Sequence, residues 1–309
     1  MAHPLVAAPC YTFAVDIEAR AEPHKVRPPL HEKHALYHGK LAAALRNRGL
    51  EANAADDSNS RRPDGDNGWW ITRNGSLGVP LDTIPIEAVS PTLDTRADWG
   101  AEIDTFWSAL RAVFHMPERS DLCGSHVHVA RSRVERFTLP QLKTIAYAVV
   151  VYESFVIELL LPARRESTFC KPNTQSSDYL YRVKGDPGAV ARLVDSAGGE
   201  EELRNIMQSS RHVLWNFDGV LPGGSGAIEF RGGRSLRGEL RTKRWMAFAV
   251  SFIHAMLQQN ELYDPSPDGR RRLPSTEILY AEVRMAAAEM DMQHHLPVNH
   301  ERFNETLTE

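Results

Sequence analysis

Hydrophobic and polar positions alternate with two different periods along the chain. Runs in which apolar residues occupy every second position predict strands, because successive side chains of a strand point to opposite faces of a sheet. These runs cover residues 11–19, 69–73, 83–89, 122–130, 212–217 and 227–232. Longer stretches with apolar residues three or four positions apart predict amphipathic helices. These stretches cover residues 31–48, 98–114, 139–161, 188–209, 236–262 and 276–290.

The order of the predicted elements indicates the fold class. Short strands with hairpin-like neighbours, separated by long helices, are typical of an α+β fold with a mostly antiparallel sheet. Two polar, turn-rich stretches, 54–68 and 263–274, predict exposed loops, and neither is flanked by a separate core. We therefore expect residues 1–309 to form a single domain, with its core at about 11–260 and a C-terminal helical extension.

Composition narrows the class of protein. Hydrophobic residues make up 42% of the chain and charged residues 25%, as in ordinary globular proteins. The formal net charge of −4 gives no general reason to expect nucleic acid or an anionic membrane as a partner. Residues 1–10 lack the features of a secretory signal, and no apolar run reaches the roughly 18 residues that a membrane span needs. We expect a cytoplasmic protein.

The three cysteines, Cys10, Cys123 and Cys170, are far apart and form no CxxC pair. This spacing argues against a disulfide framework and against a thiolate zinc site. Cys123 shares a predicted strand face with Val127 and Val129, which indicates a core residue rather than a nucleophile.

Three predicted strands carry two functional side chains separated by a single apolar residue. These pairs are Asp16 and Glu18, His126 and His128, and Glu229 and Arg231. Because residues two apart lie on the same face of a strand, each pair is expected on the face opposite its apolar neighbours. Glu87 stands in the same relation to Ile84 and Ile86.

Placed in one sheet, these strands would gather carboxylates, imidazoles and a guanidinium on a common surface. Carboxylates repel one another, and burying them without a partner costs on the order of several kcal/mol each. A divalent cation removes that penalty. Hard oxygen ligands favour Mg²⁺ or Mn²⁺, and one imidazole is compatible with either. The pattern therefore predicts a metal site.

Each pair taken alone also has another interpretation. An acidic pair in a half-exposed strand is usually the solvated face, and Glu229 with Arg231 also fits an ordinary surface ion pair of little energy. A pair of histidines two apart also occurs in metal-dependent hydrolases and oxygenases, in which His126 and His128 would be the primary ligands. Three such pairs with the same alternation favour one shared site.

The order of these motifs resembles that of the amidoligase family, a branch of the carboxylate–amine ligases with a glutamine-synthetase-like fold. The similar segments are VDIE at 15–18, IEAVSP at 86–91, CGSHVHV at 123–129 and IEFR at 228–231. The family usually has GVEIE, ELVSP, CGLHVHV and IEFR at these places. The order holds from about residue 11 to residue 260, although Asp16 shortens the first carboxylate.

The segment NGSL at 74–77 resembles the DGSL turn of the same family, with Asn74 in place of the charged residue. Asn-Gly by itself is typical of a type I′ hairpin turn. Asn74 is therefore left out of the predicted site.

The resemblance implies a curved sheet with helices on its convex face and ATP with Mg²⁺ (or Mn²⁺) on its concave face. In such ligases the acid substrate takes the γ-phosphoryl group of ATP, and an amine then displaces phosphate from the acyl phosphate. His128 would lie beside the nucleotide. The implied catalytic residues are Arg231, which meets the transferred phosphoryl group, Glu229 and His126. The implied metal ligands are Asp16, Glu18, Glu87, His126 and Glu229.

Two arginines outside these strands are further candidates for contacts with ATP. Arg164 follows the predicted helix 139–161, where the helix dipole alone favours a cation and a contact with carboxylate or phosphate is the alternative. Arg237 lies where the helix 236–262 is predicted to begin, which the dipole disfavours unless an anion is bound. The glycine-rich stretch 222–226 lacks the GK[ST] that a phosphate-binding Walker loop requires.

We therefore expect an ATP-dependent ligase that joins a small-molecule or amino-acid acid to an amine. One alternative is a metal-dependent hydrolase or oxygenase that uses the histidine pair. The other is a catalytically decayed nucleotide- or metal-binding protein on the same scaffold. Nucleic acid and membranes are not expected as partners.

Overall fold

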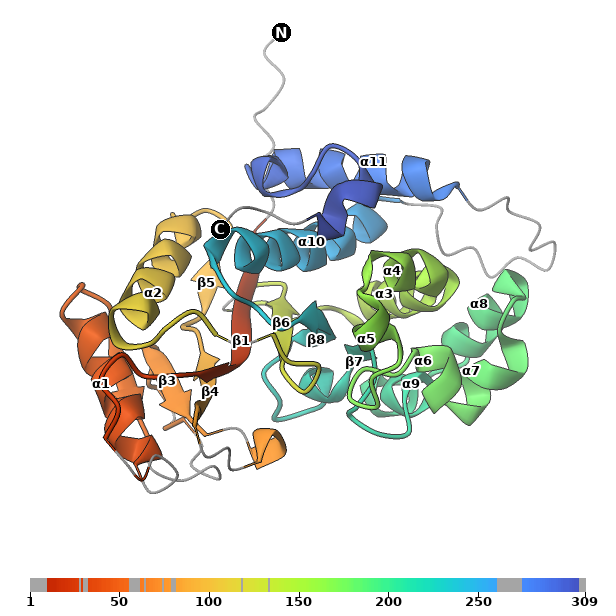
Figure 1. The fold of residues 1–309 in the computed structure, drawn as a ribbon. Coiled ribbons are helices and arrows are strands. Elements are labelled where there is room, and N and C mark those ends of the chain that lie inside the picture. Colours follow the sequence, from red (N-terminus) through yellow and green to blue (C-terminus); the bar gives the residue numbers. More distant parts are fainter. Residues whose placement is uncertain are drawn as a thin grey trace, which may run out of the picture.

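One open sheet runs through the centre of the molecule, in the strand order β2-β3-β4-β1-β6-β8-β7, and β5 also pairs with β1 (Figure 1). The strands are β1 (Thr12–Ala21), β2 (Ala52–Ala54), β3 (Trp69–Thr72), β4 (Ile84–Val89), β5 (Leu93–Asp94), β6 (Gly124–Ala130), β7 (Trp215–Asn216) and β8 (Ile228–Arg234). β2 and β3 are parallel, and the other pairs are antiparallel. The chain is thus a mixed α/β protein with a mixed sheet.

The computed structural model describes residues 10–27, 29, 33–55, 62–63, 65–73, 75–78, 82–117, 119–132, 134–259 and 274–305. Asn74 lies outside the described residues. So do residues 56–61 and 64 of the first predicted loop and residues 263–273 of the second.

Helices cover the apolar face of the sheet and extend beyond both of its ends (Figure 1). The longer helices are α1 (His34–Arg46), α2 (Trp99–Val113), α3 (Leu139–Val151), α8 (Pro187–Asp195), α9 (Glu200–Met207), α10 (Glu239–Gln258) and α11 (Thr276–Glu289). The shorter ones are α4 (Glu153–Leu159), α5 (Pro162–Arg165), α6 (Asn173–Ser176) and α7 (Asp178–Val183). Helix α10 packs on β1 and β6, and α1 packs on β2, β3 and β4.

The alternation in the strands explains why one face of the sheet is apolar. In β1, Phe13, Val15 and Ile17 are buried, and Phe13 meets the ring of Trp99 in α2 edge-on, with ring centroids 5.4 Å apart. In β8, Phe230 stacks on Trp245 of α10 at a centroid distance of 5.4 Å. These contacts fix the apolar face against α2 and α10. The alternate residues, which carry the functional groups, are left for the opposite face.

The predicted C-terminal extension is present as α11, which packs along α10 (Figure 1). Leu279 and Val283 of α11 are buried in the same hydrophobic cluster as the strands. The extension is therefore part of the core. Among the helices of the described residues, none combines the length and the apolar character needed to cross a bilayer.

Two stretches that were each predicted as one continuous helix form two helices in the structure. The helix expected at 139–161 is divided into α3 and α4 at Tyr152, directly after three valines whose β-branched side chains weaken helix formation. The helix expected at 188–209 is divided into α8 and α9 by Gly198 and Gly199. The predicted strand at 212–217 is reduced to β7. Sequence analysis missed β2 and β5, which are too short to show a period.

Candidate functional site

A cavity of about 270 Å³ lies on the polar face of the sheet. It is lined by all but one of the residues predicted for the site, namely Asp16, Glu18, Glu87, His126, His128, Arg164, Glu229 and Arg231. Leu122, Phe169, Arg211 and His212 complete the lining and were not predicted. The structure thus brings together groups from four strands, the short helix α5 and three connecting segments.

Strand register accounts for most of this convergence. Asp16 of β1 lies directly opposite His126 of β6, and His128 of β6 lies opposite Glu229 of β8. On the other side of β1, Glu18 lies opposite Glu87 of β4. Because residues two apart share a face, the antiparallel pairing places all of these side chains on one surface.

A β-bulge in β8 shapes the cavity next to His126. Ser125 pairs with Gly233 and Val127 with Phe230, so β8 contributes one more residue than β6 between these two pairs. A Cβ on Gly232 would lie 2.5 Å from the Phe230 ring, so the bulge depends on glycine at this place. The bulge occurs one residue after Arg231, whose side chain remains in the cavity with that of Glu229.

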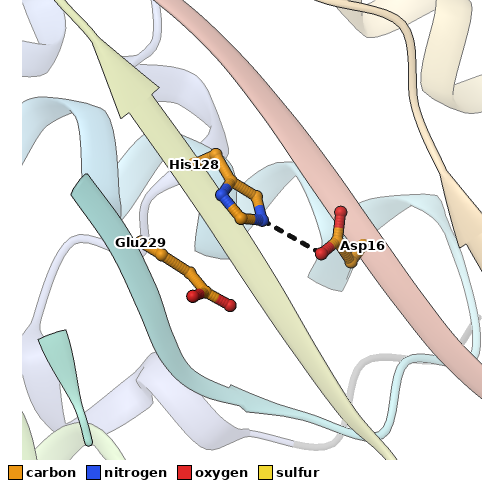
Figure 2. Close-up of side chains that lie close together, drawn as sticks. All are labelled: Asp16, His128 and Glu229. Carbon is orange, nitrogen blue, oxygen red and sulfur yellow. Dashed lines mark hydrogen bonds and ion pairs between the residues drawn. The ribbon is translucent and has the colours of Figure 1, made fainter. Parts of the chain in front are cut away.

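Asp16, His128 and Glu229 form the group best suited to hold a cation. Each offers one oxygen or nitrogen atom, and the three atoms all lie within 4.8 Å of one another. Figure 2 shows the three side chains converging from β1, β6 and β8, with His128 Nε2 3.0 Å from Asp16 Oδ2. Two carboxylates and one imidazole are a donor set that fits Mn²⁺ or Mg²⁺.

The two histidines differ in place from what the sequence indicated. His128, expected beside a nucleotide, belongs to the three-residue group. His126, expected as a metal ligand, is 6% exposed and lies beside that group, with Nδ1 3.4 Å from Glu229 Oε1 and 3.8 Å from Asp16 Oδ2. The His126 ring thus lies at ion-pair distance from both carboxylates, while His128 is hydrogen-bonded to Asp16.

The charges of the cavity shift the pKa values of its groups. Burial alone would raise the pKa of Asp16, but the nearby His128 and His126 hold that pKa well below its usual range. Burial disfavours the charged form of His128, yet Asp16 and Glu229 raise its pKa to about 9. Glu229 is buried as well, and the two histidines and Arg231 lower the pKa of its carboxyl group. At neutral pH, a cation must therefore displace the His128 proton.

Glu18 and Glu87 form a second acidic pair at the edge of the cavity. Glu18 Oε2 accepts a hydrogen bond from the backbone N–H of Gly124 at 2.7 Å, which fixes this carboxylate. Burial and the charges of Asp16 and Glu18 raise the pKa of Glu87 to about 7. Burial, together with the neighbouring carboxylates of Asp16 and Glu18, thus favours the protonated form of Glu87 near neutral pH.

Replacing Glu87 by Gln is expected to stabilise the metal-free protein at alkaline pH. Because the pKa of Glu87 rises from 4.5 to about 7 on folding, its ionisation destabilises the fold as pH increases through this window. The gain should be small at pH 5 and reach up to about 3 kcal/mol at pH 8. Urea unfolding at both pH values measures it. The exposed Glu201→Gln is the control. An equal gain in both variants would show that ionisation of Glu87 does not destabilise the folded protein.

Arg231 is held rigidly between the acidic group and the backbone. Its Nη1 donates to Glu229 Oε1 at 2.5 Å, and its Nε donates to the Phe169 carbonyl at 3.2 Å. The other oxygen of Glu229 accepts from Asn216 Nδ2 of β7 at 2.7 Å. Asn216, absent from the prediction, lies in the predicted strand 212–217, and its position opposite Glu229 is set by pairing that the sequence does not show.

Of the two predicted arginines outside the strands, one lines the cavity and the other does not. Arg164 lines the cavity from α5, is 4% exposed, and donates from Nη2 to the Arg231 carbonyl at 2.7 Å. Arg237 is not brought to the cavity, because its Nε donates to the Pro117 carbonyl at 2.9 Å. The helix expected to begin near Arg237 begins at Glu239, so the predicted conflict with the helix dipole does not arise.

Both cysteines near the site are unsuited to nucleophilic catalysis. Cys123 is buried, as predicted for a core residue, and burial raises the pKa of its thiol to about 11. Burial also raises the pKa of Cys170, which lies 3.1 Å from the Arg164 carbonyl. A thiolate is the reactive form, so both groups are inert at neutral pH.

A larger cavity of about 520 Å³ adjoins the first and shares Asp16 and His128 with it. Its other lining residues are Thr12, Phe13, Ala14, Asn67, Val89, Thr92, Ala130, Ser132, Ser225 and Ala227. These side chains are apolar or hydroxylated, apart from the amide of Asn67, and none of them is charged. The two cavities therefore form a charged compartment and a neutral one that meet at Asp16 and His128.

Comparisons of the chain with family models, curated proteins and solved structures found no match.

Proposed function

We propose that this protein is an ATP-dependent carboxylate–amine ligase, with a glutamine-synthetase-like curved sheet that carries the nucleotide on its polar face. The observation that supports the proposal best is the position of the Asp16, His128 and Glu229 group. It lies within reach of the Arg231 guanidinium, between a charged cavity and a neutral one. Transfer of a phosphoryl group requires this combination of a cation site and a fixed guanidinium.

In this proposal, Asp16, His128 and Glu229 hold Mg²⁺ or Mn²⁺, and Glu18 and Glu87 supply further carboxylate oxygens at the edge of the site. The bound cation offsets the charge of the ATP phosphates. His126 lies beside the carboxylates of Asp16 and Glu229, with Nδ1 at 3.8 and 3.4 Å, and attracts them electrostatically when protonated. The acidic groups thus position the phosphates without taking part in bond making.

The arginines of the charged cavity stabilise the transferred group. Arg231 is fixed by Glu229 and Phe169, so its guanidinium needs little rearrangement when charge develops on the phosphoryl oxygens. Arg211 and Arg164 line the same compartment and attract the substrate carboxylate that receives the phosphoryl group. An amine then attacks the acyl carbon, and phosphate leaves as the amide bond forms.

The neutral cavity is suited to the nucleoside of ATP. Its volume of about 520 Å³ lies in the range of about 300–1,000 Å³ that is usual for small-molecule sites. Its hydroxyl groups, from Thr12, Thr92, Ser132 and Ser225, can bond to a ribose or a base without a net charge. The phosphates would then extend past Asp16 and His128 toward Arg231.

The ligase proposal predicts phosphate release that depends on Mg²⁺, ATP and an acid. A panel of carboxylic acids is incubated with Mg-ATP, with and without amines, and phosphate and amide products are measured. Hydroxylamine should trap the acyl phosphate as a hydroxamate, since it is a strong nucleophile toward activated acyl groups. Phosphate release that is equal with and without acids would contradict a ligase.

One observation favours a different function, a metal-dependent hydrolase or oxygenase. His128 lies within the candidate ligand group and His126 lies beside it, so an imidazole-bound transition metal also fits this position. Metal analysis of the purified protein separates the two functions. Tightly bound zinc or iron supports the hydrolase or oxygenase, and stabilisation by Mg-ATP without such a metal supports the ligase.

A further inference from the structure

A third cavity, of about 350 Å³, lies on the other side of Arg164. We propose that it binds a phosphoryl or carboxylate group, and we call it the arginine pocket. It is defined by Arg119, Arg164, Arg234 and Arg241 together with Ser120, Ser235 and Asn304. This site does not depend on the proposed ligase activity, and it takes a different ligand from the cation-binding group.

Charge is the first reason for the assignment. The four arginines come from four separate parts of the fold: the segment before β6, α5, the end of β8 and the first turn of α10. Among the described residues that line the pocket, Asp121 is the one carboxylate, and it is exposed. Even when only Arg119 and Arg164 are counted, the described residues of the lining carry more positive than negative charge in a confined space, which an anion would offset.

Burial is the second reason. Arg164 is 4% exposed and Arg241 is 8% exposed, so water does not screen either guanidinium fully. The Nε of Arg164 is buried and finds no hydrogen-bond acceptor among the residues that the structure describes. This atom is closed off from the pocket, so an oxyanion there would approach other atoms of the guanidinium and offset its buried charge.

The third reason is the close approach of Arg164 to β6. A Cβ at Gly124 would lie 3.0 Å from Arg164 Nη2 and 3.2 Å from Nη1, so glycine at this position lets the guanidinium lie against the strand. There Arg164 lines both the arginine pocket and the charged cavity, and it donates to the Arg231 carbonyl. An anion in the pocket would therefore contact the same guanidinium that faces the candidate metal site.

The donors define the chemistry of the ligand. Guanidinium groups bind phosphate and carboxylate through paired hydrogen bonds, and the hydroxyl groups of Ser120 and Ser235 and the amide of Asn304 add neutral donors. The oxyanion has two conceivable sources with this shared chemistry. It is either a separate small anion, which acts as an effector, or the distal acidic group of an acid substrate that reaches past Arg164.

Binding of inorganic phosphate to the full chain, without ATP or divalent metal, tests the pocket by calorimetry at constant ionic strength. Arg119→Gln is the main variant, because Arg119 is exposed and its replacement leaves the core intact. It should weaken phosphate binding about tenfold, the usual size of one charge-assisted contact. Arg241→Gln should weaken binding at least as much.

A matched control locates the effect. Arg192→Gln changes an exposed arginine of α8 outside the pocket and should bind phosphate like the parent chain. Arg211→Gln changes an arginine of the charged cavity and reports any phosphate that binds there instead. Phosphate affinity that is unchanged in both Arg119→Gln and Arg241→Gln, whatever the response of Arg211→Gln, would overturn the proposal.

Glutarate, a dicarboxylate, distinguishes the two sources of the anion. If a substrate spans both compartments, Arg119→Gln and Arg211→Gln should each weaken glutarate binding. If the pocket holds a separate effector, Arg119→Gln alone should weaken it. Both outcomes support an anion site in the pocket, whereas glutarate binding that neither Arg119→Gln nor Arg241→Gln alters would contradict one.

Discussion

Replacing Glu229 by Gln should lower the affinity for Mn²⁺ by about a hundredfold or more and abolish metal-dependent ATP turnover. Glu229 contributes one of the two carboxylates in the candidate ligand group and is placed opposite His128 by the β6–β8 register. Removing a residue that only hydrogen-bonds to a metal ligand already lowers the affinity for the metal about 10–100-fold. Removing the charge of a ligand itself is expected to lower it further. The change also removes a charge that raises the pKa of His128.

The Glu229→Gln change keeps the shape of the side chain, so the carbonyl oxygen of the new amide can still accept a hydrogen bond from Arg231 or Asn216. Mn²⁺ binding is measured by calorimetry, and thermal unfolding shows whether the variant folds. Glu201→Gln on the exposed face of α9 is the matched control and should bind Mn²⁺ like the parent chain. A folded Glu229→Gln variant with unchanged Mn²⁺ affinity would remove Glu229 from the metal site.

Replacing Arg231 by Gln should reduce kcat by about a thousandfold while leaving Mn²⁺ binding intact. A guanidinium that stabilises a transferred phosphoryl group is typically worth about 10³–10⁵ in kcat. Arg231 is not in the ligand group, and loss of its positive charge should make the site slightly more attractive to a cation. The opposite responses of kcat and metal affinity separate its role from that of Glu229.

Stability needs its own control in this variant, because Arg231 is 4% exposed and pairs with the buried Glu229. Breaking a buried ion pair from one side typically costs about 3–5 kcal/mol. Arg231→Lys keeps the charge and should recover most of this stability, but it cannot donate to Glu229 and Phe169 in the same fixed geometry. Full kcat in Arg231→Lys would show that only the charge matters, and full kcat in Arg231→Gln would refute the catalytic role.

The sequence specified the strands that carry the chemistry because their alternation is regular. In β1, β6 and β8 the apolar residues occupy one face and are buried, so the faces of Asp16, His128 and Glu229 followed directly. Two-residue and three-residue strands such as β5 and β2 have no readable period. The order of the strands in the sheet depends on tertiary packing, which local patterns do not encode.

The sequence predicted the site residues that lie on strands better than those that lie on the segments between strands and helices. Arg211 and Phe169 come from segments without a period, and His212 is the first residue of the predicted strand 212–217. Their contribution to the cavity depends on how α5 and β7 are placed. Both histidines lie on the predicted face and line the cavity. Which of them would contact a metal and which a nucleotide stays a prediction, because strand alternation places both on the same face and does not distinguish them.

The central claim is that Asp16, His128 and Glu229 hold one divalent cation at the boundary of two cavities. Anomalous diffraction from crystals grown with Mn²⁺ and a non-hydrolysable ATP analogue tests it most directly. We predict a manganese peak among these three side chains, with the phosphates of the analogue directed toward Arg231. A manganese peak elsewhere, with His128 still hydrogen-bonded to Asp16 and Glu229 still paired with Arg231, would contradict the metal site and the proposed function together.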